Sequence, residues 1–123
     1  MTYPTILPRS SRVLVEVSQE RVRQDAKWGE QNHENGTRDD RRLLRDAELP
    51  TWGTLCYRAR SLTDAAARAG SVEYLDILLE EVAEAFSESD PQRLRAELIQ
   101  VAAVAIAWVE AIDRRANQQV RGS

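Results

Sequence analysis

The stretch of sequence that decides the fold is residues 98–109, Leu-Ile-Gln-Val-Ala-Ala-Val-Ala-Ile-Ala-Trp-Val. Every residue in it except Gln100 is apolar, so on a helix the apolar side chains surround the whole circumference. A helix that is apolar on every side is buried on every side. Because the whole chain has only 123 residues, we expect this segment either at the centre of the other helices or at an oligomer interface.

Apolar residues at helical spacing and capping residues predict three further helices and an all-α single domain over residues 1–123. Residues 13–17 (VLVEV) also fit a strand. Residues 1–10 are expected to form a loose arm, and residues 29–50 a long connection with a short helix near Arg41–Ala47. The first predicted helix runs from Ser11 to about Trp28, with Ser10 or Ser11 as its cap, and the second covers Trp52–Ala69, capped by Thr51 and ended by Gly70. The third runs from Val72 to about Glu88 with Ser71 as its cap, and the fourth from Pro91 to about Asn117 with Asp90 as its cap.

The composition excludes several classes of protein. Seventeen basic and 20 acidic residues give a net charge of −3, whereas binders of nucleic acid or membrane surfaces need a basic footprint. The lone Cys56 rules out an internal disulfide and fits a reducing compartment. Since no apolar run reaches the ~20 residues that span a bilayer, we expect a cytoplasmic protein without nucleic-acid or membrane partners.

Glutamates cluster on one side of the predicted helix that begins at Val72. On a helical wheel they share an arc of about 100°. Glu81 and Glu84 are one turn apart, so their carboxylate oxygens can converge on one hard cation, which would relieve a repulsion of a few tenths of a kcal/mol. The alternative is a solvated acidic face. The glutamates of this arc are Glu73, Glu80, Glu81, Glu84 and Glu88.

Glu97 is a carboxylate on the apolar stripe of the next helix, and Gln100 follows it by one turn. Burial of an unpaired carboxylate costs several kcal/mol, so Glu97 needs a partner. In one alternative Glu97 binds Arg58 or Arg60, and Gln100 binds backbone. The other alternative is a site between two antiparallel helices, with oxygen ligands that suit Mg²⁺ or Mn²⁺. Its members would be Glu81, Glu84, Glu97 and Gln100.

These acidic residues carry a resemblance to a known family. Glu80-Glu81-x-x-Glu84 followed by Glu97-x-x-Gln100 resembles the EExxE…ExxD signature of the MazG-like, all-α nucleoside triphosphate pyrophosphohydrolases. The stretch from Lys27 to His33 (KWGEQNH) is similar to the Trp-Glu-Gln-Phe-His stretch of the dCTPase branch, with one extra residue. Residues 108–115 (WVEAIDRR) resemble small MazG-like proteins of actinobacteria and their phages. The resemblance covers residues 16–33 and 72–115.

The resemblance implies an activity and a ligand set. The family binds Mg²⁺ and cleaves the bond between the α and β phosphates of a nucleotide, releasing a monophosphate and pyrophosphate. Carried onto this chain, Glu81, Glu84 and Glu97 become metal ligands, and Glu80 holds a further ion or orients the attacking water. The family's last acid is Gln100 here, which keeps an oxygen ligand but loses a charge. Family members are dimers or tetramers, so a homodimer or homotetramer is expected.

Residues around the first motif are predicted to bind substrate. Trp28 can stack on a nucleobase, or it can be a core aromatic at a helix end. Arg23 and Lys27 can hold phosphate oxygens, or they can be solvated. The predicted substrate-binding residues are Arg23, Lys27, Trp28, Gln31 and His33. Two functions follow from the sequence: a Mg²⁺-dependent nucleotide pyrophosphohydrolase, or a weak or inactive helical module that binds a nucleotide or a protein.

Overall fold

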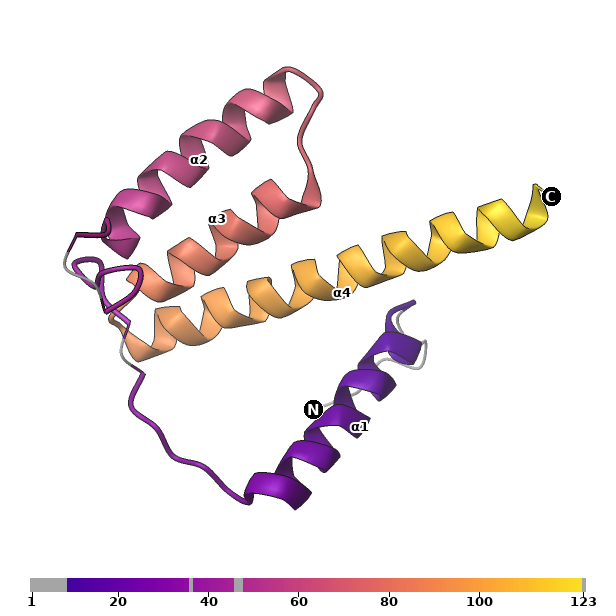
Figure 1. The fold of residues 1–123 in the computed structure, drawn as a ribbon, viewed down its shortest axis with the longest axis horizontal. Coiled ribbons are helices and arrows are strands. Elements are labelled where there is room, and N and C mark those ends of the chain that lie inside the picture. Colours follow the sequence, from indigo (N-terminus) through magenta and orange to yellow (C-terminus); the bar gives the residue numbers. More distant parts are fainter. Residues whose placement is uncertain (1–8, 36, 46–47, 123) are drawn as a thin grey trace. The chain divides into compact units, whose positions relative to one another are not determined.

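The structure is a computed structural model that describes residues 9–35, 37–45 and 48–122. Within these ranges all regular secondary structure is helical, which confirms the all-α prediction (Figure 1). Of the predicted N-terminal arm, residues 1–8 lie outside the described ranges. The helices are α1 (Ser11–Trp28), α2 (Trp52–Arg68), α3 (Tyr74–Ser87) and α4 (Pro91–Arg121).

The chain divides into two compact units. The first contains α1 and the part of α4 from Ile106 onward, and the second contains the residues from Glu34 to Ala105. Val13 and Ala111 are the buried apolar residues of the first unit. Because α1 is helical from Ser11 onward, residues 13–17 do not form the alternative strand.

Local capping signals set two of the helix starts as predicted. The backbone N–H of Thr54 donates to the Thr51 hydroxyl oxygen at 3.2 Å, which satisfies a free donor at the start of α2. At α4 the N–H of Arg93 donates to Asp90 Oδ2 at 3.0 Å. Gly70, with φ at +71°, follows the end of α2 in a conformation that suits glycine.

The predicted start of α3 was two residues early. Ser71 does not cap α3, since its N–H donates to the Ala66 carbonyl at 2.8 Å and thereby closes the end of α2. The capping residue is Glu73, whose N–H donates to Asp76 Oδ2 at 3.0 Å. At the other end of the chain, α4 continues to Arg121, beyond the predicted end near Asn117.

The short helix expected near residues 41–47 is absent from residues 41–45, and residues 46–47 lie outside the described ranges. Here the backbone pairs with the segment before α2 instead. Leu43 N donates to Pro50 O at 2.9 Å, Trp52 N donates to Arg41 O at 2.8 Å, and Arg42 forms an isolated antiparallel bridge with Thr51. These long-range bonds take the place of intrahelical ones.

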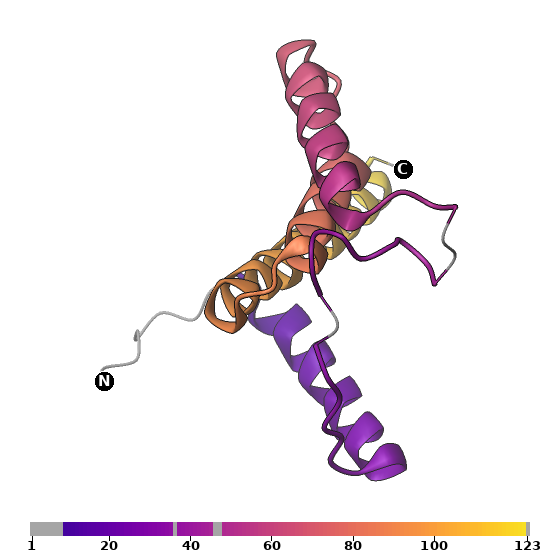
Figure 2. The same cartoon turned by 90° about the vertical axis from the view of Figure 1, so that its left-hand side faces the viewer.

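In the second unit, α2 and α3 run antiparallel, and α4 runs antiparallel to α3 after a short turn (Figures 1 and 2). Small side chains fill much of the interior, so the helices can approach closely. The buried residues of this unit are Cys56, Ala59, Ala83, Ala85 and Leu94. Gly53 N donates to Asp39 O at 2.8 Å, which fixes the loop before α2 over its first turn.

Part of the apolar stretch of α4 is exposed. Leu98 and Ile99 are 46% and 55% exposed. The central position and the oligomer interface therefore both stay predictions. Among the described residues, no helix combines the length and the apolar character needed to cross a membrane.

Gly53→Ala is expected to destabilise the protein, although alanine is the better helix former. A Cβ at this position would lie 2.9 Å from the Asp39 carbonyl oxygen, which the Gly53 N–H holds in place. We expect a loss of about 1–3 kcal/mol in the free energy of unfolding, measured by urea denaturation. Ser61→Ala, at an exposed position of the same helix, is the control. Equal stability of the Gly53 variant and the parent would contradict the close approach.

Candidate metal centre

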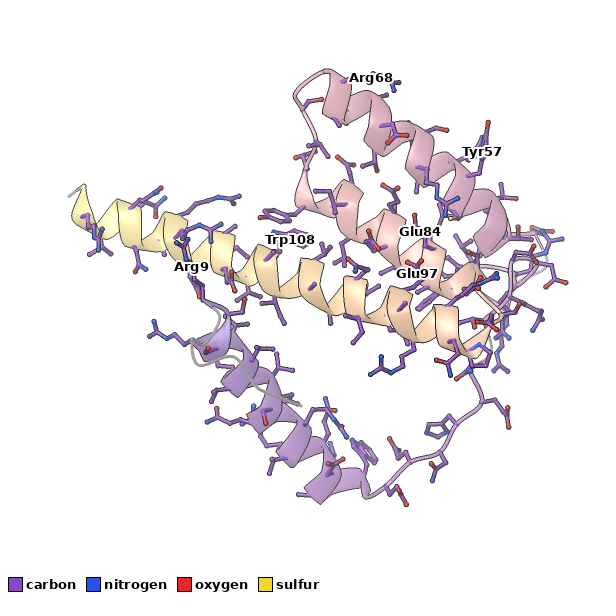
Figure 3. All side chains as sticks on the ribbon, turned by 180° about the vertical axis from the view of Figure 1, so that it is seen from behind. Arg9, Tyr57, Arg68, Glu84, Glu97 and Trp108 are labelled. Atoms are coloured by element: carbon purple, nitrogen blue, oxygen red, sulfur yellow. The ribbon has the colours of Figure 1, made fainter. Side chains whose placement is uncertain are left out.

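Three glutamates from two helices meet in the second unit. Glu81 and Glu84 of α3 and Glu97 of α4 each offer a carboxylate oxygen, and these oxygens lie within 4.8 Å of one another. The labelled Glu84 and Glu97 side chains point toward each other across the two helices (Figure 3). This trio contains three of the four residues in the predicted metal site.

The turn between the two helices explains why these residues meet. Glu84 precedes Asp90 by six residues, and Glu97 follows it by seven. In an antiparallel helix pair, residues at similar distances from the turn lie opposite each other. Glu81 is one helical turn from Glu84 on the same side of α3. The Asp90 cap therefore helps to set the register that assembles the trio.

An arginine from α2 binds the trio. Arg60 Nε donates to Glu84 Oε1 at 3.0 Å, and the Glu84 side chain is only 18% exposed. The alternative partner for Glu97 was Arg58 or Arg60, but the structure places Arg60 on Glu84. One guanidinium against three carboxylates leaves the cluster with an excess of negative charge.

Burial and mutual repulsion disfavour the charged forms of the acidic residues. Burial raises the pKa of Glu97, and contact with the Glu84 carboxyl raises it further. Burial also raises the pKa of Glu81, and the charges of Glu84 and Glu80 add to this effect. A bound cation would relieve the repulsion, and a set of carboxylate oxygens suits a hard divalent ion such as Mg²⁺ or Mn²⁺. The residues present therefore fit such an ion.

Glu80 and Gln100 flank the trio in sequence. Burial raises the pKa of Glu80, and the charges of Glu84 and Asp64 raise it further. Glu80 thus lies in the same acidic environment, although it is not one of the three converging residues. Gln100 is exposed on α4, one turn after Glu97. Its role as a fourth ligand stays a prediction.

The predicted substrate-binding residues belong to the first unit. Trp28, Gln31 and His33 line one open pocket of about 850 Å³ at the end of α1. Trp28 is 61% exposed, so it is not a core aromatic. Lys27 Nζ lies 4.8 Å from the centroid of the Trp28 ring, in a cation–π contact.

Arg23 has a partner within its own helix. It binds Glu20 at 2.7 Å, on an exposed face of α1. Arg23 and Lys27 are not among the residues that line the pocket at the end of α1. Their predicted role with phosphate groups stays a prediction.

Sequence reasoning missed two features of the second unit, namely the arginine that binds Glu84 and a contact between two aromatic side chains. Arg60 follows the buried Ala59 on α2, and this place beside a small apolar residue is the signal that could have set it opposite α3. Trp52 and Phe86 lie against each other, with ring centroids 4.7 Å apart in an edge-to-face arrangement. Their contact joins residues 34 positions apart, for which the helical periodicity gives no signal.

Comparisons of the chain with protein-family models, with curated proteins and with solved structures found no match.

Replacement of Glu81 and Glu84 by alanine together should abolish binding of Mg²⁺ and Mn²⁺ in isothermal titration calorimetry. The reason is that two of the three converging oxygens are removed. The control is the Glu16→Ala, Glu34→Ala double variant, which removes the same charge at exposed positions. Unchanged metal binding in the Glu81, Glu84 variant would remove these residues from the site.

Without metal, the trio should make the protein less stable as the pH rises. The pKa of Glu97 in the folded protein lies above its ordinary value of 4.5. Protonation of Glu97 therefore adds to the free energy of unfolding at a pH below 4.5, and this added stability is lost as the pH rises through the folded pKa. Glu97→Gln keeps the side chain neutral. We expect the variant to melt no lower than the parent at neutral pH and its advantage to shrink as the pH falls through the raised pKa of Glu97.

Thermal unfolding followed by circular dichroism across this pH range, with a chelator present, measures the effect. Glu16→Gln on α1 is the control for the loss of one exposed charge. A Glu97→Gln variant that melts well below the parent at neutral pH would show that the carboxylate itself stabilises the metal-free fold.

Proposed function

We propose that this chain is a Mg²⁺-dependent nucleotide pyrophosphohydrolase of the MazG-like kind, which converts a nucleoside triphosphate into a monophosphate and pyrophosphate. The observation that carries the proposal is the convergence of Glu81, Glu84 and Glu97 within 4.8 Å. In the sequence these residues occupy positions that resemble the acidic signature of that family. Supporting observations are the all-helical fold and the antiparallel arrangement of α3 and α4.

In this proposal the residues of the chain have distinct tasks. Glu81, Glu84 and Glu97 hold the ion, and Arg60 fixes the Glu84 carboxylate through its bond to Oε1. When bound, Mg²⁺ supplies positive charge that offsets the negative charge of the phosphates as the bond breaks. Glu80, whose pKa burial raises, can accept a proton from the attacking water. Water then adds across the bond between the α and β phosphates.

The second candidate is a helical module that binds a nucleotide or a protein without turnover. The observation that favours it is Gln100, which stands where the family signature has an acid and is exposed on α4. A neutral ligand lowers the charge of the site and so lowers its metal affinity. The exposed Leu98 and Ile99 nearby support assembly into a homodimer or homotetramer in either case.

Pyrophosphate release from a panel of ribo- and deoxyribonucleoside triphosphates, with Mg²⁺ or Mn²⁺, tests the enzyme against the module. We expect turnover by the parent, and a loss of about a hundredfold or more in Glu97→Gln, since an ion's charge stabilisation is worth several kcal/mol. Gln100→Asp should keep or raise the rate, because it restores a charged ligand. Glu16→Gln should leave the rate unchanged.

The outcomes separate the two functions. Absence of turnover in both the parent and Gln100→Asp would overturn the enzyme and favour the module. Turnover that survives in Glu97→Gln would place the chemistry elsewhere in the chain.

A further inference from the structure

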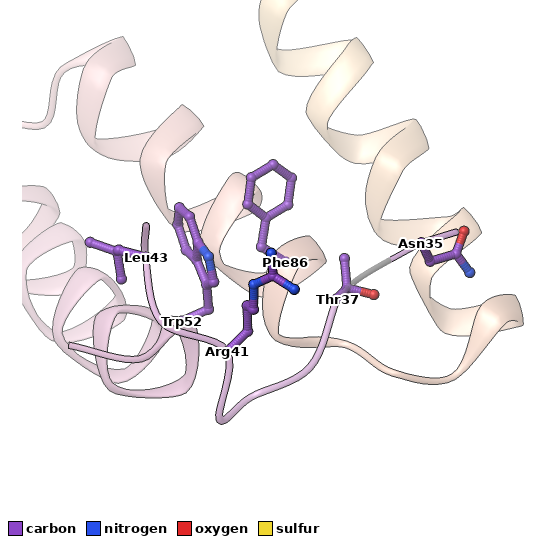
Figure 4. A pocket seen from close by; sticks show the side chains of 6 residues that line it. All are labelled: Asn35, Thr37, Arg41, Leu43, Trp52 and Phe86. Atoms are coloured by element: carbon purple, nitrogen blue, oxygen red, sulfur yellow. The ribbon is translucent and has the colours of Figure 1, made fainter. Parts of the chain in front are cut away.

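A pocket distinct from the acidic trio lies in the second unit, between the loop before α2 and the end of α3 (Figure 4). Its volume is about 240 Å³, below the ~300–1,000 Å³ of sites for drug-sized ligands. It is therefore scaled to a single planar ring system. The residues that line it are Asn35, Thr37, Arg41, Leu43, Trp52 and Phe86.

The wall that the loop contributes is anchored to both neighbouring helices. Thr37 Oγ1 donates to the Glu88 carbonyl at 2.6 Å, and Arg38 N donates to the Phe86 carbonyl at 3.0 Å. On the other side, Trp52 N donates to the Arg41 carbonyl at 2.8 Å. These bonds hold Thr37, Arg38 and Arg41 in place on both sides of the pocket. The pocket is thus preorganised.

Arg41 differs from the arginines that surround it. Arg38 binds Asp40 at 2.9 Å, and Arg42 donates to the Leu49 carbonyl at 2.8 Å. Arg41 is half-buried, yet none of the ion pairs found among the described residues involves its guanidinium. A guanidinium offers only donors, in a planar fork that fits two adjacent acceptors.

The aromatic residues supply the complementary surface. Trp52 meets Phe86 edge to face, at an interplanar angle of 81°, and Phe86 is one of the exposed large apolar side chains. Base–aromatic stacking uses such faces. A flat ring can therefore lie against the aromatic side of the pocket while its polar edge meets Arg41.

We propose that this pocket binds a nucleobase whose edge presents two adjacent acceptors, as the O6 and N7 edge of guanine does. The choice of a nucleobase among planar rings rests on the proposed function. Adenine presents a donor beside N7, which cannot pair with a guanidinium. The pocket therefore favours guanine over adenine.

The test follows the three tryptophan indole signals of the ¹⁵N-labelled full-length protein by NMR. Trp28→Phe and Trp108→Phe assign these signals, and the third belongs to Trp52. The probes are GMP, AMP and inorganic phosphate, each added with a chelator present. We expect GMP to shift the Trp52 signal saturably, at a concentration about tenfold lower than AMP. Inorganic phosphate should leave the signal in place.

Two matched variants test the role of the guanidinium. Arg41→Gln should remove the preference for GMP over AMP, whereas Arg45→Gln, at an exposed position of the same loop, should keep it. Circular dichroism establishes that both variants are folded. If Arg41→Gln unfolds the loop, Arg41→Lys replaces it as the test. Lysine keeps the positive charge but lacks the planar guanidinium, so this variant should also lose the preference for GMP over AMP.

Three results would overturn the proposal. They are equal affinity of the parent for GMP and AMP, an equal shift with inorganic phosphate, and a nucleotide shift confined to Trp28. None of these depends on turnover. Absence of pyrophosphate release in both the parent and Gln100→Asp would overturn the proposed function, and the GMP titration would still test the pocket.

Discussion

The second unit has to accommodate a constraint between like charges, because three glutamates of α3 and α4 meet at the register that these helices adopt. Glu81, Glu84 and Glu97 converge to within 4.8 Å, and burial together with mutual repulsion raises the pKa of Glu81 and Glu97. Arg60 contributes one opposite charge through Glu84. The remaining negative charge is a cost in the metal-free fold, and a divalent cation would convert it into a gain.

The packing around the trio brings an opposite charge close to the three glutamates. The interior of the unit consists largely of small side chains, such as Ala59 of α2 and Ala83 of α3, which let the helix backbones approach. Close approach brings Arg60 of α2 within 3.0 Å of Glu84. The same helices place Trp52 and Phe86 side by side in the pocket between the loop before α2 and the end of α3. Both candidate sites thus use side chains that the packing of α2 on α3 brings together.

The proposed hydrolase and the proposed base pocket make separate demands on the molecule. The first needs charge and therefore uses the half-buried carboxylates between α3 and α4. The second needs an aromatic surface and a planar donor, which Trp52, Phe86 and Arg41 provide. The two sets share no residue.

The sequence by itself determined that four helices form and roughly where they lie, although not the start of α3 or the end of α4. Thr51 and Asp90 cap their helices through bonds to residues three positions away, and such local signals can be read from one segment. Helical spacing predicted that Glu81 and Glu84 can share a ligand. The place of Glu97 on an apolar stripe predicted that it needs a partner, and a joint site that also included Gln100 was one of two alternatives. Only the tertiary structure decided that Arg60 binds Glu84, that Trp52 meets Phe86, and that residues 41–45 pair with the segment before α2. Each of these contacts joins residues outside one helical turn, where periodicity carries no information.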